Sequence, residues 1–313
     1  MAEKKRSPAA DYLVYLIVRC FVCVVQALSF EIACRLALAL AWLVYKVDKR
    51  HRQVATENLK IAFPGQYTDA QIDRMVRGVY QHFCTMLIEI MHMPRRYHLH
   101  NYKKSAIVRE PERLAEAYLT GRPVLFVTGH LGNWEMAGYQ LGLAGFHSHA
   151  IARPLDNPYL DDFLRSFRER TGQKLLAKHG DFANMEKLLK EGGIIATLAD
   201  QDAGQRGLFV DFFGKPASTH KAVALLALEH NVPMIVFAMP RLEGRYQLWA
   251  IDVIYPEDYD KSPDAVREIT QRFTKGLETL VRQAPEQYFW LHRRWKHAPI
   301  ERKKKSKPTP QAA

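Results

Sequence analysis

Apolar residues are distributed along the chain in two ways, which divide it into a helical first third and an alternating remainder. Residues 12–30 are almost wholly apolar, with Arg19 and Gln26 as the main interruptions. This run is close to the ~20 residues that a membrane-spanning helix needs. Residues 32–45 form a second apolar segment, too short to span a bilayer alone. The pattern predicts a membrane anchor with an interfacial helix; the alternative is two buried helices of a soluble domain.

Basic residues flank this apolar region on both sides, so the positive-inside rule does not fix its orientation. The arrangement suits a segment that enters one leaflet from the cytoplasmic face and holds its basic residues on anionic headgroups. No clear small-residue cleavage site follows, which disfavours a cleaved signal peptide. The flanking residues are Lys4, Lys5 and Arg6 on one side and Lys46, Lys49, Arg50 and Arg52 on the other.

Three further helices are predicted before the first strand. The pattern over 52–63 is helical. Thr68 and Gln71 then have the spacing of a capping box, and apolar residues recur at helical spacing over 68–93. A polar connection leads to a third helix over 111–120.

Beyond residue 120, short apolar runs alternate with helical stretches, which is typical of an α/β domain. We predict one such domain over 47–297, a helical N-terminal extension over 1–46, and a basic, Pro-rich, disordered tail over 298–313. Residues 204–214 are expected to form a loop. The predicted strands are 124–127, 149–152, 175–176, 194–198, 233–238 and 246–254, and the predicted helices are 133–143, 157–171, 182–190, 218–230, 266–282 and 285–295.

Charge and cysteine content narrow the class of partner without choosing it. The 313 residues carry a formal charge of +12, which favours a nucleic acid, an anionic lipid surface, a phosphorylated substrate or an acidic carrier protein. Three of the four cysteines lie in the N-terminal apolar region, so we expect a reducing compartment and no disulfide framework. Cys20 and Cys23 form a C-x-x-C without a second ligand pair nearby, which favours ordinary membrane or core cysteines.

The leading candidate for chemistry is His130, which follows the strand 124–127 on a loop. Ligands of open α/β sheets bind at the carboxyl ends of strands, and a neutral imidazole is a competent general base. Asn133 is expected to cap the next helix, and Glu135 places a carboxylate five residues after the histidine. No well-placed Ser or Cys nucleophile accompanies them, which favours direct attack by a substrate hydroxyl. The alternative is a structural loop histidine paired to its own helix.

Residues 129–135, GHLGNWE, resemble the H-x4-D/E signature of glycerolipid-type acyltransferases. Four further segments resemble one branch of these enzymes, the late (secondary) lipid A biosynthesis acyltransferases, and occur in the same order. The resemblance covers roughly residues 40–297, and the apolar N-terminal segment also matches the membrane anchor of that family. The segments are RPLDNP at 153–158, ADQD at 199–202, FFGKPAST at 212–219 and PEQYFWLHRRWK at 285–296.

The resemblance implies an α/β fold with a mixed central sheet flanked by helices, located at the cytoplasmic face of the inner membrane. It implies transfer of a fatty acyl chain from acyl carrier protein to a hydroxyl of a membrane glycolipid, a lipid A precursor in that family, with no metal or other cofactor. In the matching positions His130 is the base and Glu135 its partner. Arg153 resembles the family's arginine near the site, and we expect it to stabilise the oxyanion.

Further candidates lie at strand ends or in the resembling segments. Asp200 and Asp202 end a buried strand and are expected to face the same crevice, with Asp202 organising its loop through backbone N–H groups. Phenylalanines of the 204–214 loop either line an acyl-chain channel or belong to the core. The predicted substrate-binding residues are Asn133, Asp200, Gln201, Asp202, Lys215, His292, Arg293 and Arg294, the last three in a cationic cluster with Lys296, Trp290 and Trp295 that suits anionic headgroups or sugar phosphates.

Several alternatives stay open from the sequence. The acceptor can be another membrane glycolipid, of the phosphoglycolipid or ornithine-lipid type. The chain can be a non-catalytic lipid- or carrier-binding protein on the same fold. It can also be a soluble metal-dependent hydrolase that uses His130, Asp200 and Asp202, although Asp-x-Asp without other obvious ligands is a weak metal motif. The adjoining apolar segment disfavours nucleic acid.

Overall fold

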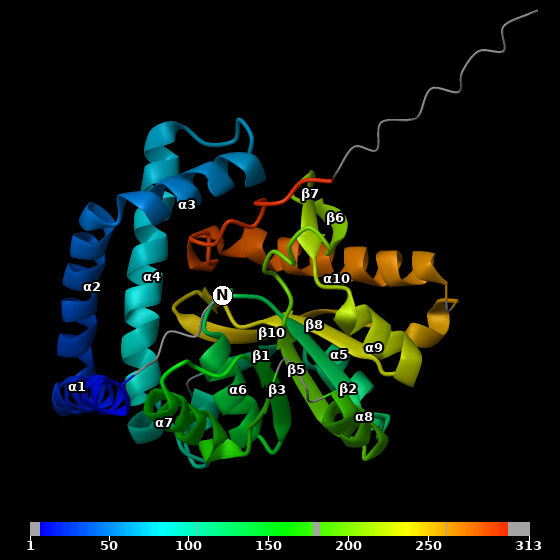
Figure 1. Cartoon of the computed structure of the whole chain (residues 1–313), viewed down its shortest axis with the longest axis horizontal. Coiled ribbons are helices and arrows are strands. Elements are labelled where there is room, and N and C mark those ends of the chain that lie inside the picture. The colour runs from blue at the N-terminus through cyan, green and yellow to red at the C-terminus, as the bar shows by residue number, and fades with distance from the viewer. Residues whose placement is uncertain (1–6, 105, 178–181, 261, 300–313) are drawn as a thin grey trace, which may run out of the picture.

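The computed structural model describes residues 7–104, 106–177, 182–260 and 262–299. A central sheet is flanked by helices, and two apolar helices, α1 (Pro8–Ala27) and α2 (Phe30–Val47), stand at one flank beside the long helix α4 (Asp69–Arg96) (Figure 1). The predicted α/β fold with an N-terminal helical extension is confirmed. The predicted tail falls mostly on residues outside the described ranges.

The sheet is mixed, with strand order β1-β10-β8-β2-β5-β3-β4. Neighbouring strands are parallel except that β10 runs antiparallel to β8 and to the short β9. The strands are β1 (Ala106–Arg109), β2 (Val124–Thr128), β3 (Ser148–Ala152), β4 (Lys174–Ala177), β5 (Ile194–Leu198), β8 (Met234–Ala238), β9 (Arg241–Leu242) and β10 (Arg245–Ile254).

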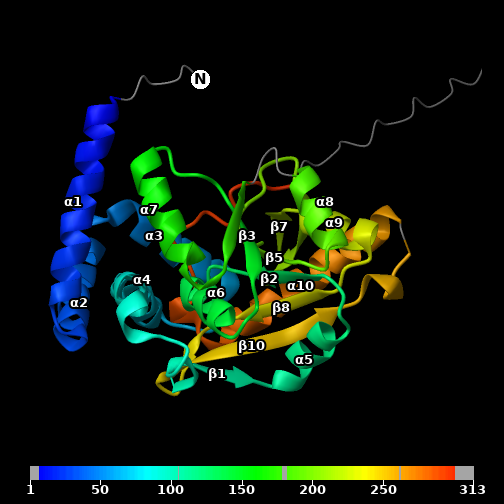
Figure 2. The same ribbon diagram turned by 90° about the horizontal axis from the view of Figure 1, so that it is seen from below.

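Helices cover both faces of the sheet, because side chains of a strand alternate between its two faces. The helices seen in Figures 1 and 2 are α3 (Lys49–Ala62), α5 (Pro111–Leu119), α6 (Trp134–Leu143), α7 (Pro158–Arg168), α8 (Phe182–Lys190), α9 (Ala222–His230) and α10 (Pro263–Gln283). Val124 and Phe126 of β2 pack with α5 and α6, whereas Leu125 and Val127 pack with α8, α9 and α10.

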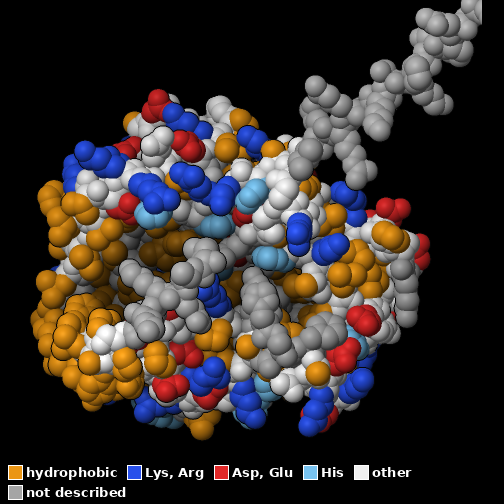
Figure 3. All heavy atoms as spheres, viewed as in Figure 1, with side chains coloured by type: hydrophobic (Ala, Val, Ile, Leu, Met, Phe, Trp, Pro, Cys, Tyr) orange, Lys and Arg blue, Asp and Glu red, His pale blue; other side chains and the backbone are white. Residues whose placement is uncertain are grey.

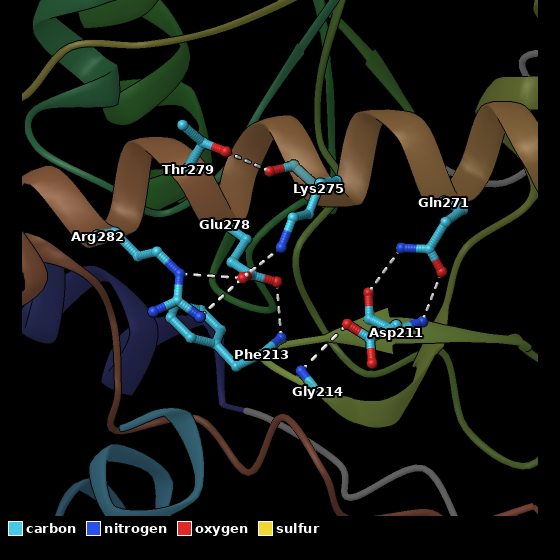
Figure 4. Close-up of polar contacts among 8 residues, drawn as sticks. All are labelled: Asp211, Phe213, Gly214, Gln271, Lys275, Glu278, Thr279 and Arg282. Carbon is cyan, nitrogen blue, oxygen red and sulfur yellow. Dashed lines mark hydrogen bonds and ion pairs between the residues drawn. The ribbon is translucent and has the colours of Figure 1, made fainter. Parts of the chain in front are cut away.

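One hairpin replaces the expected loop at 204–214. Strands β6 (Leu208–Phe212) and β7 (Lys215–Thr219) pair through a two-residue turn in which Phe213 and Gly214 both have positive φ. Phenylalanine is not a usual residue at such a position, so the sequence lacks the common hairpin signal. The structure supplies the restraint instead, since the backbone N–H of Phe213 donates to buried Glu278 of α10 at 2.8 Å (Figure 4).

The hairpin decides two open questions. Phe212 and Phe213 are buried in the core with Trp290, so these two phenylalanines are core residues and do not line a channel. The predicted helix at 218–230 begins four residues later, at Ala222, because β7 takes the residues before it. Two other predictions were wrong: β1 lies in the expected polar connection, and only Pro285–Gln287 of the predicted helix 285–295 is helical, as a short 3₁₀ turn.

Helices α1 and α2 expose apolar faces. Among the described residues, α1 is the one helix long and apolar enough to cross a membrane. In α2 the small residues Ala33, Ala37 and Ala41 are buried, whereas the opposite side is apolar and exposed. Figure 3 shows these apolar side chains gathered over one flank. The exposed residues are Leu13, Leu16, Ile17, Phe21 and Val24 of α1 and Ile32, Leu36, Leu40, Trp42, Leu43 and Val47 of α2.

We expect this surface to hold the protein on a membrane. The double substitution Ile17→Asp and Leu36→Asp should move the protein into the soluble fraction, because an Asp costs roughly 2.5–3.5 kcal/mol at the centre of a bilayer. Both side chains are exposed, so the fold should survive. Fractionation with and without detergent measures the result, with Leu119→Asp on the exposed side of α5 as control. A double variant that stays in the membrane fraction would contradict the assignment.

Candidate active site

The central pair of the site is His130 with Asp200. Strands β2 and β5 are parallel neighbours, and Thr128 lies opposite Leu198, so the residues that follow both strands meet at one edge of the sheet. His130 Nδ1 lies 2.8 Å from Asp200 Oδ1, and the backbone N–H of His130 donates to Asp200 Oδ2 at 2.7 Å. The Asp200 side chain is only 3% exposed. Because the carboxylate binds Nδ1, Nε2 is the nitrogen that can accept a proton.

Glu135 does not contact His130 in this way, which corrects the expected pairing. Its carboxylate accepts two hydrogen bonds from Arg168 of α7, one of them from Nε at 2.9 Å. Glu135 is in the first turn of α6, so its direction follows that helix, whereas Nδ1 of His130 faces the end of the neighbouring strand. Glu135 acts on the histidine only as a nearby negative charge.

Burial and neighbouring charges shift the pKa values of both His130 and Asp200. Burial by itself would lower the pKa of His130, but the charge and hydrogen bond of Asp200 outweigh it and raise the pKa above its usual value. Burial likewise opposes ionisation of Asp200, yet His130 and the nearby Arg294 hold the pKa of that carboxyl below its usual value. Tyr288 is also buried near this carboxylate, and the pKa of its hydroxyl is raised well above the usual value, chiefly by burial and next by the charge of Asp200. Asp200 is therefore ionised and fixes the tautomer of His130.

The catalytic loop, residues 129–133, is held by backbone contacts. Gly132 has a φ of 64°, and a Cβ there would come within 2.0 Å of the Met239 carbonyl oxygen, so glycine is required. The Asn133 N–H donates to that same oxygen at 3.0 Å, and the Phe289 N–H donates to the carbonyl of His130 at 3.0 Å. The rings of Phe289 and Trp134 also pack against the imidazole. The position of His130 is therefore set by several elements at once.

His130 opens onto a cavity of about 650 Å³. The size is that of a small-molecule site, and most of the lining is aliphatic. Polar residues also line the cavity, among them Arg153, Arg168, Gln201 and His220. The larger aliphatic side chains of the lining are Leu125, Ile151, Leu155, Leu164, Leu175, Leu176, Met185, Ile195, Leu198, Val223 and Leu226. Such a cavity can take a long apolar chain with its reactive end at the histidine.

Two of the arginines that line the cavity, Arg153 and Arg168, differ in burial. Arg153 lines it, but its side chain is 80% exposed and lies 3.4 Å from Asp156 at the surface. Arg168 is more enclosed and is fixed by Glu135 through Nε and one hydrogen of Nη2, so Nη1 and the second hydrogen of Nη2 can donate to a ligand. Sequence reasoning missed Arg168, because its only signal is helical spacing on α7, where residues 161, 164, 165 and 168 share the cavity face.

Several predicted substrate-binding residues have structural roles instead. Asn133 is fully buried: its Oδ1 caps α6 by accepting from the Met136 N–H, and its Nδ2 donates to Glu89. Arg294 is 2% exposed and donates to the Ser218 carbonyl and the Thr219 hydroxyl. Burial removes both from contact with a headgroup or sugar, which corrects those two predictions.

The remaining candidates divide between loop supports and surface residues. Asp202 accepts from the Gly204 N–H at 3.2 Å and lies 2.7 Å from His297 Nδ1, so the expected loop-organising role is confirmed. His292 Nε2 accepts from the Asp202 N–H, which makes it a second support. Gln201 lines the cavity, whereas Arg293 and Lys215 are exposed, the latter at the β6–β7 turn. A substrate contact by these three stays a prediction.

The geometry does not favour the metal-dependent hydrolase. Both carboxylate oxygens of Asp200 accept hydrogen bonds from His130, and Asp202 faces His297. These groups therefore do not converge on one ion position. Among the described residues, the one group of three potential ligands within metal-binding distance is a different set on α8 and α9: Glu186, Glu229 and His230.

A known protein family matches almost the whole chain. A model of the bacterial lipid A biosynthesis acyltransferase family matches residues 3–297. The chain belongs to this family. It is 26% identical to a lipid A biosynthesis lauroyltransferase of Escherichia coli over 282 residues, covering 88% of this chain and 89% of the relative.

Two further relatives extend the comparison. A lipid A biosynthesis palmitoleoyltransferase of Escherichia coli is 24% identical over 279 residues, covering 87% of this chain and 88% of the relative. A phosphatidylinositol mannoside acyltransferase of Mycobacterium tuberculosis is 26% identical over 188 residues, covering 59% and 58%. Membership of an acyltransferase family makes the non-catalytic alternative the weaker one.

Proposed function

We propose that this chain moves a fatty acyl chain from acyl carrier protein to a hydroxyl of a membrane glycolipid, with His130 as general base. The observation that carries the proposal is the His130–Asp200 pair at the end of a largely aliphatic cavity of about 650 Å³. The acyl chain occupies the cavity, which brings its thioester carbonyl to the imidazole. Acyl carrier protein as donor is what the family resemblance implies, and an acidic carrier suits the positive charge of the chain.

The reaction needs no enzyme nucleophile. His130 Nε2 takes the proton of the acceptor hydroxyl while the hydroxyl oxygen attacks the thioester carbonyl carbon. The resulting oxyanion is stabilised by an arginine, for which enclosed Arg168 is better placed than exposed Arg153. The intermediate collapses, the carbon–sulfur bond breaks, and the imidazolium returns the proton to the leaving thiolate. Asp200 stabilises the imidazolium throughout.

The acceptor we propose is a lipid A precursor, the class that the names of the two Escherichia coli relatives indicate. The relative from Mycobacterium tuberculosis favours a second candidate, a phosphatidylinositol mannoside-type glycolipid. In both cases the acceptor lies in a membrane, which agrees with the exposed apolar faces of α1 and α2. We propose the cytoplasmic face of the inner membrane as the location, because an acyl carrier protein donor is available there.

The His130→Ala variant tests the chemistry. With acyl carrier protein thioester and a lipid A precursor in vesicles, it should lose at least about 10²-fold in kcat, the usual contribution of a positioned base. Product mass spectrometry measures turnover, and His100→Ala at an exposed position is the matched control. Unchanged turnover by His130→Ala would overturn the base assignment. Lipid binding without product by the native protein, with either acceptor class, would overturn the enzymatic proposal.

A further inference from the structure

Helix α4 stands between α2 and the α/β domain (Figure 1). It contacts the apolar helix pair and, through His82, the catalytic loop. On one side it packs against α2, where Ala33 and Ala37 are buried in a cluster with Ile88 of α4. Polar contacts strengthen the junction with α1: Gln26 Nε2 donates to the carbonyl of Met91 at 2.6 Å. The helix pair and α4 are therefore joined along a close-packed interface, which allows little independent movement.

The other side of α4 reaches the catalytic loop through His82 and Phe83. His82 Nε2 lies 3.0 Å from the carbonyl oxygen of Gly132, two residues after His130. Burial lowers the pKa of His82 to about 4, so the ring is neutral and Nε2 carries the hydrogen that it donates. The ring of Phe83 packs against Trp134, and Trp134 in turn packs edge-on against the imidazole of His130. Of His82, Phe83, Trp134 and His130, only His130 lines the cavity.

Two turns further along the same helix, Glu89 makes a second contact with the loop. Its buried carboxylate accepts from Asn133 Nδ2 at 3.1 Å and from the hydroxyl of Tyr246, and it pairs with Arg241. Asn133 is the residue that caps α6. An acidic side chain on the buried side of an amphipathic helix is costly unless it is paired, so its partners fix Glu89 in one position. Glu89 thereby couples α4 to the first turn of α6.

We propose that His82 and Glu89 are positioning residues, which tie the placement of the α1–α2 pair on a bilayer to the orientation of His130. The inference rests on the proposed function, in which His130 is the base. Helix α4 is one continuous element with the apolar pair on one side and two fixed contacts to the loop on the other. A displacement of the helix pair therefore carries α4 with it and is transmitted to the carbonyl of Gly132 and the side-chain amide of Asn133. A 1 Å misplacement of a reacting group can cost ~10²-fold in rate.

Single substitutions test the loop contacts. In vesicles, Glu89→Gln and His82→Leu should each lower kcat about 10–100-fold, with KM for the thioester within about twofold, because the cavity is untouched. His82→Gln keeps a donor and should recover most of the loss. Gln81→Ala, at an exposed position of the same helix, is the matched control. Unchanged kcat in both Glu89→Gln and His82→Leu would overturn the proposal, while loss of activity in His130→Ala would still support the proposed function.

A double-mutant cycle tests the link to the helix pair. Ala37→Leu enlarges a residue that is 2% exposed on the α2 side of α4 and touches no part of the loop. Ala37→Leu should lower kcat in vesicles. In the double variant with Glu89→Gln, the fold loss in kcat should be clearly smaller than the product of the two single losses. Distant, independent sites usually give multiplicative effects. Circular dichroism confirms folding of each variant, and a multiplicative result would overturn the coupling through α4.

Discussion

Replacing Asp200 by asparagine is expected to lower kcat by about two to four orders of magnitude. The asparagine preserves the shape of the side chain but removes the charge that stabilises the imidazolium, and its amide can stabilise the wrong tautomer of His130. The contact at stake is the 2.8 Å bond between Asp200 Oδ1 and His130 Nδ1. Steady-state turnover of thioester and acceptor in vesicles measures the loss. Asp202→Asn in the same loop should cost less than about tenfold, since Asp202 faces His297.

The same variant should also shift the pH dependence. His130 must be deprotonated to act as a base, so kcat/KM rises with pH through its pKa in the free enzyme. Asp200 raises that pKa and burial lowers it. Once the carboxylate is lost, burial dominates and the pKa falls, so the residual activity of Asp200→Asn should reach its plateau at lower pH than in the native protein. If the dependence of kcat/KM on pH does not shift in Asp200→Asn, the pairing of Asp200 with His130 is contradicted.

Glu135→Gln and Arg168→Ala are each expected to lower kcat about 10–100-fold, and the double variant should be little worse than the stronger single one. The two side chains form one partly buried ion pair between α6 and α7, so removal of either partner releases the other. This pair places Arg168 on the wall of the cavity that contains His130. A double-mutant cycle on kcat measures the coupling, with Arg170→Ala at an exposed position as control.

The pH profile separates this role from that of a direct partner of His130. Glu135 contributes only a minor charge effect to the pKa of His130, behind both contributions of Asp200. Glu135→Gln should therefore shift the profile less than Asp200→Asn does. An equal or larger shift would restore Glu135 as the electrostatic partner of the base.

Local signals in the sequence predicted most elements correctly. The capping box of Thr68 and Gln71 is present at the start of α4, and Asn133 caps α6. Strand β5 and helix α8 have the predicted bounds. These features depend on neighbouring residues, so their pattern is visible along the chain. The β6–β7 hairpin depends on Glu278, far along the chain, and could not be found in that way.

Local sequence patterns are enough to predict the α/β alternation, the apolar N-terminal helices and the place of His130 at the end of a strand. The identity of the acid that contacts the histidine depends on the folded chain. In the sequence, Glu135 follows His130 by five residues and Asp200 ends another buried strand, so both carboxylates are candidates for the site. In the structure β2 and β5 are adjacent parallel strands, which brings Asp200 to Nδ1 of His130. Glu135 instead follows the direction of α6 and meets Arg168. Strand order and helix direction are properties of the folded chain, and spacing along the sequence does not contain them.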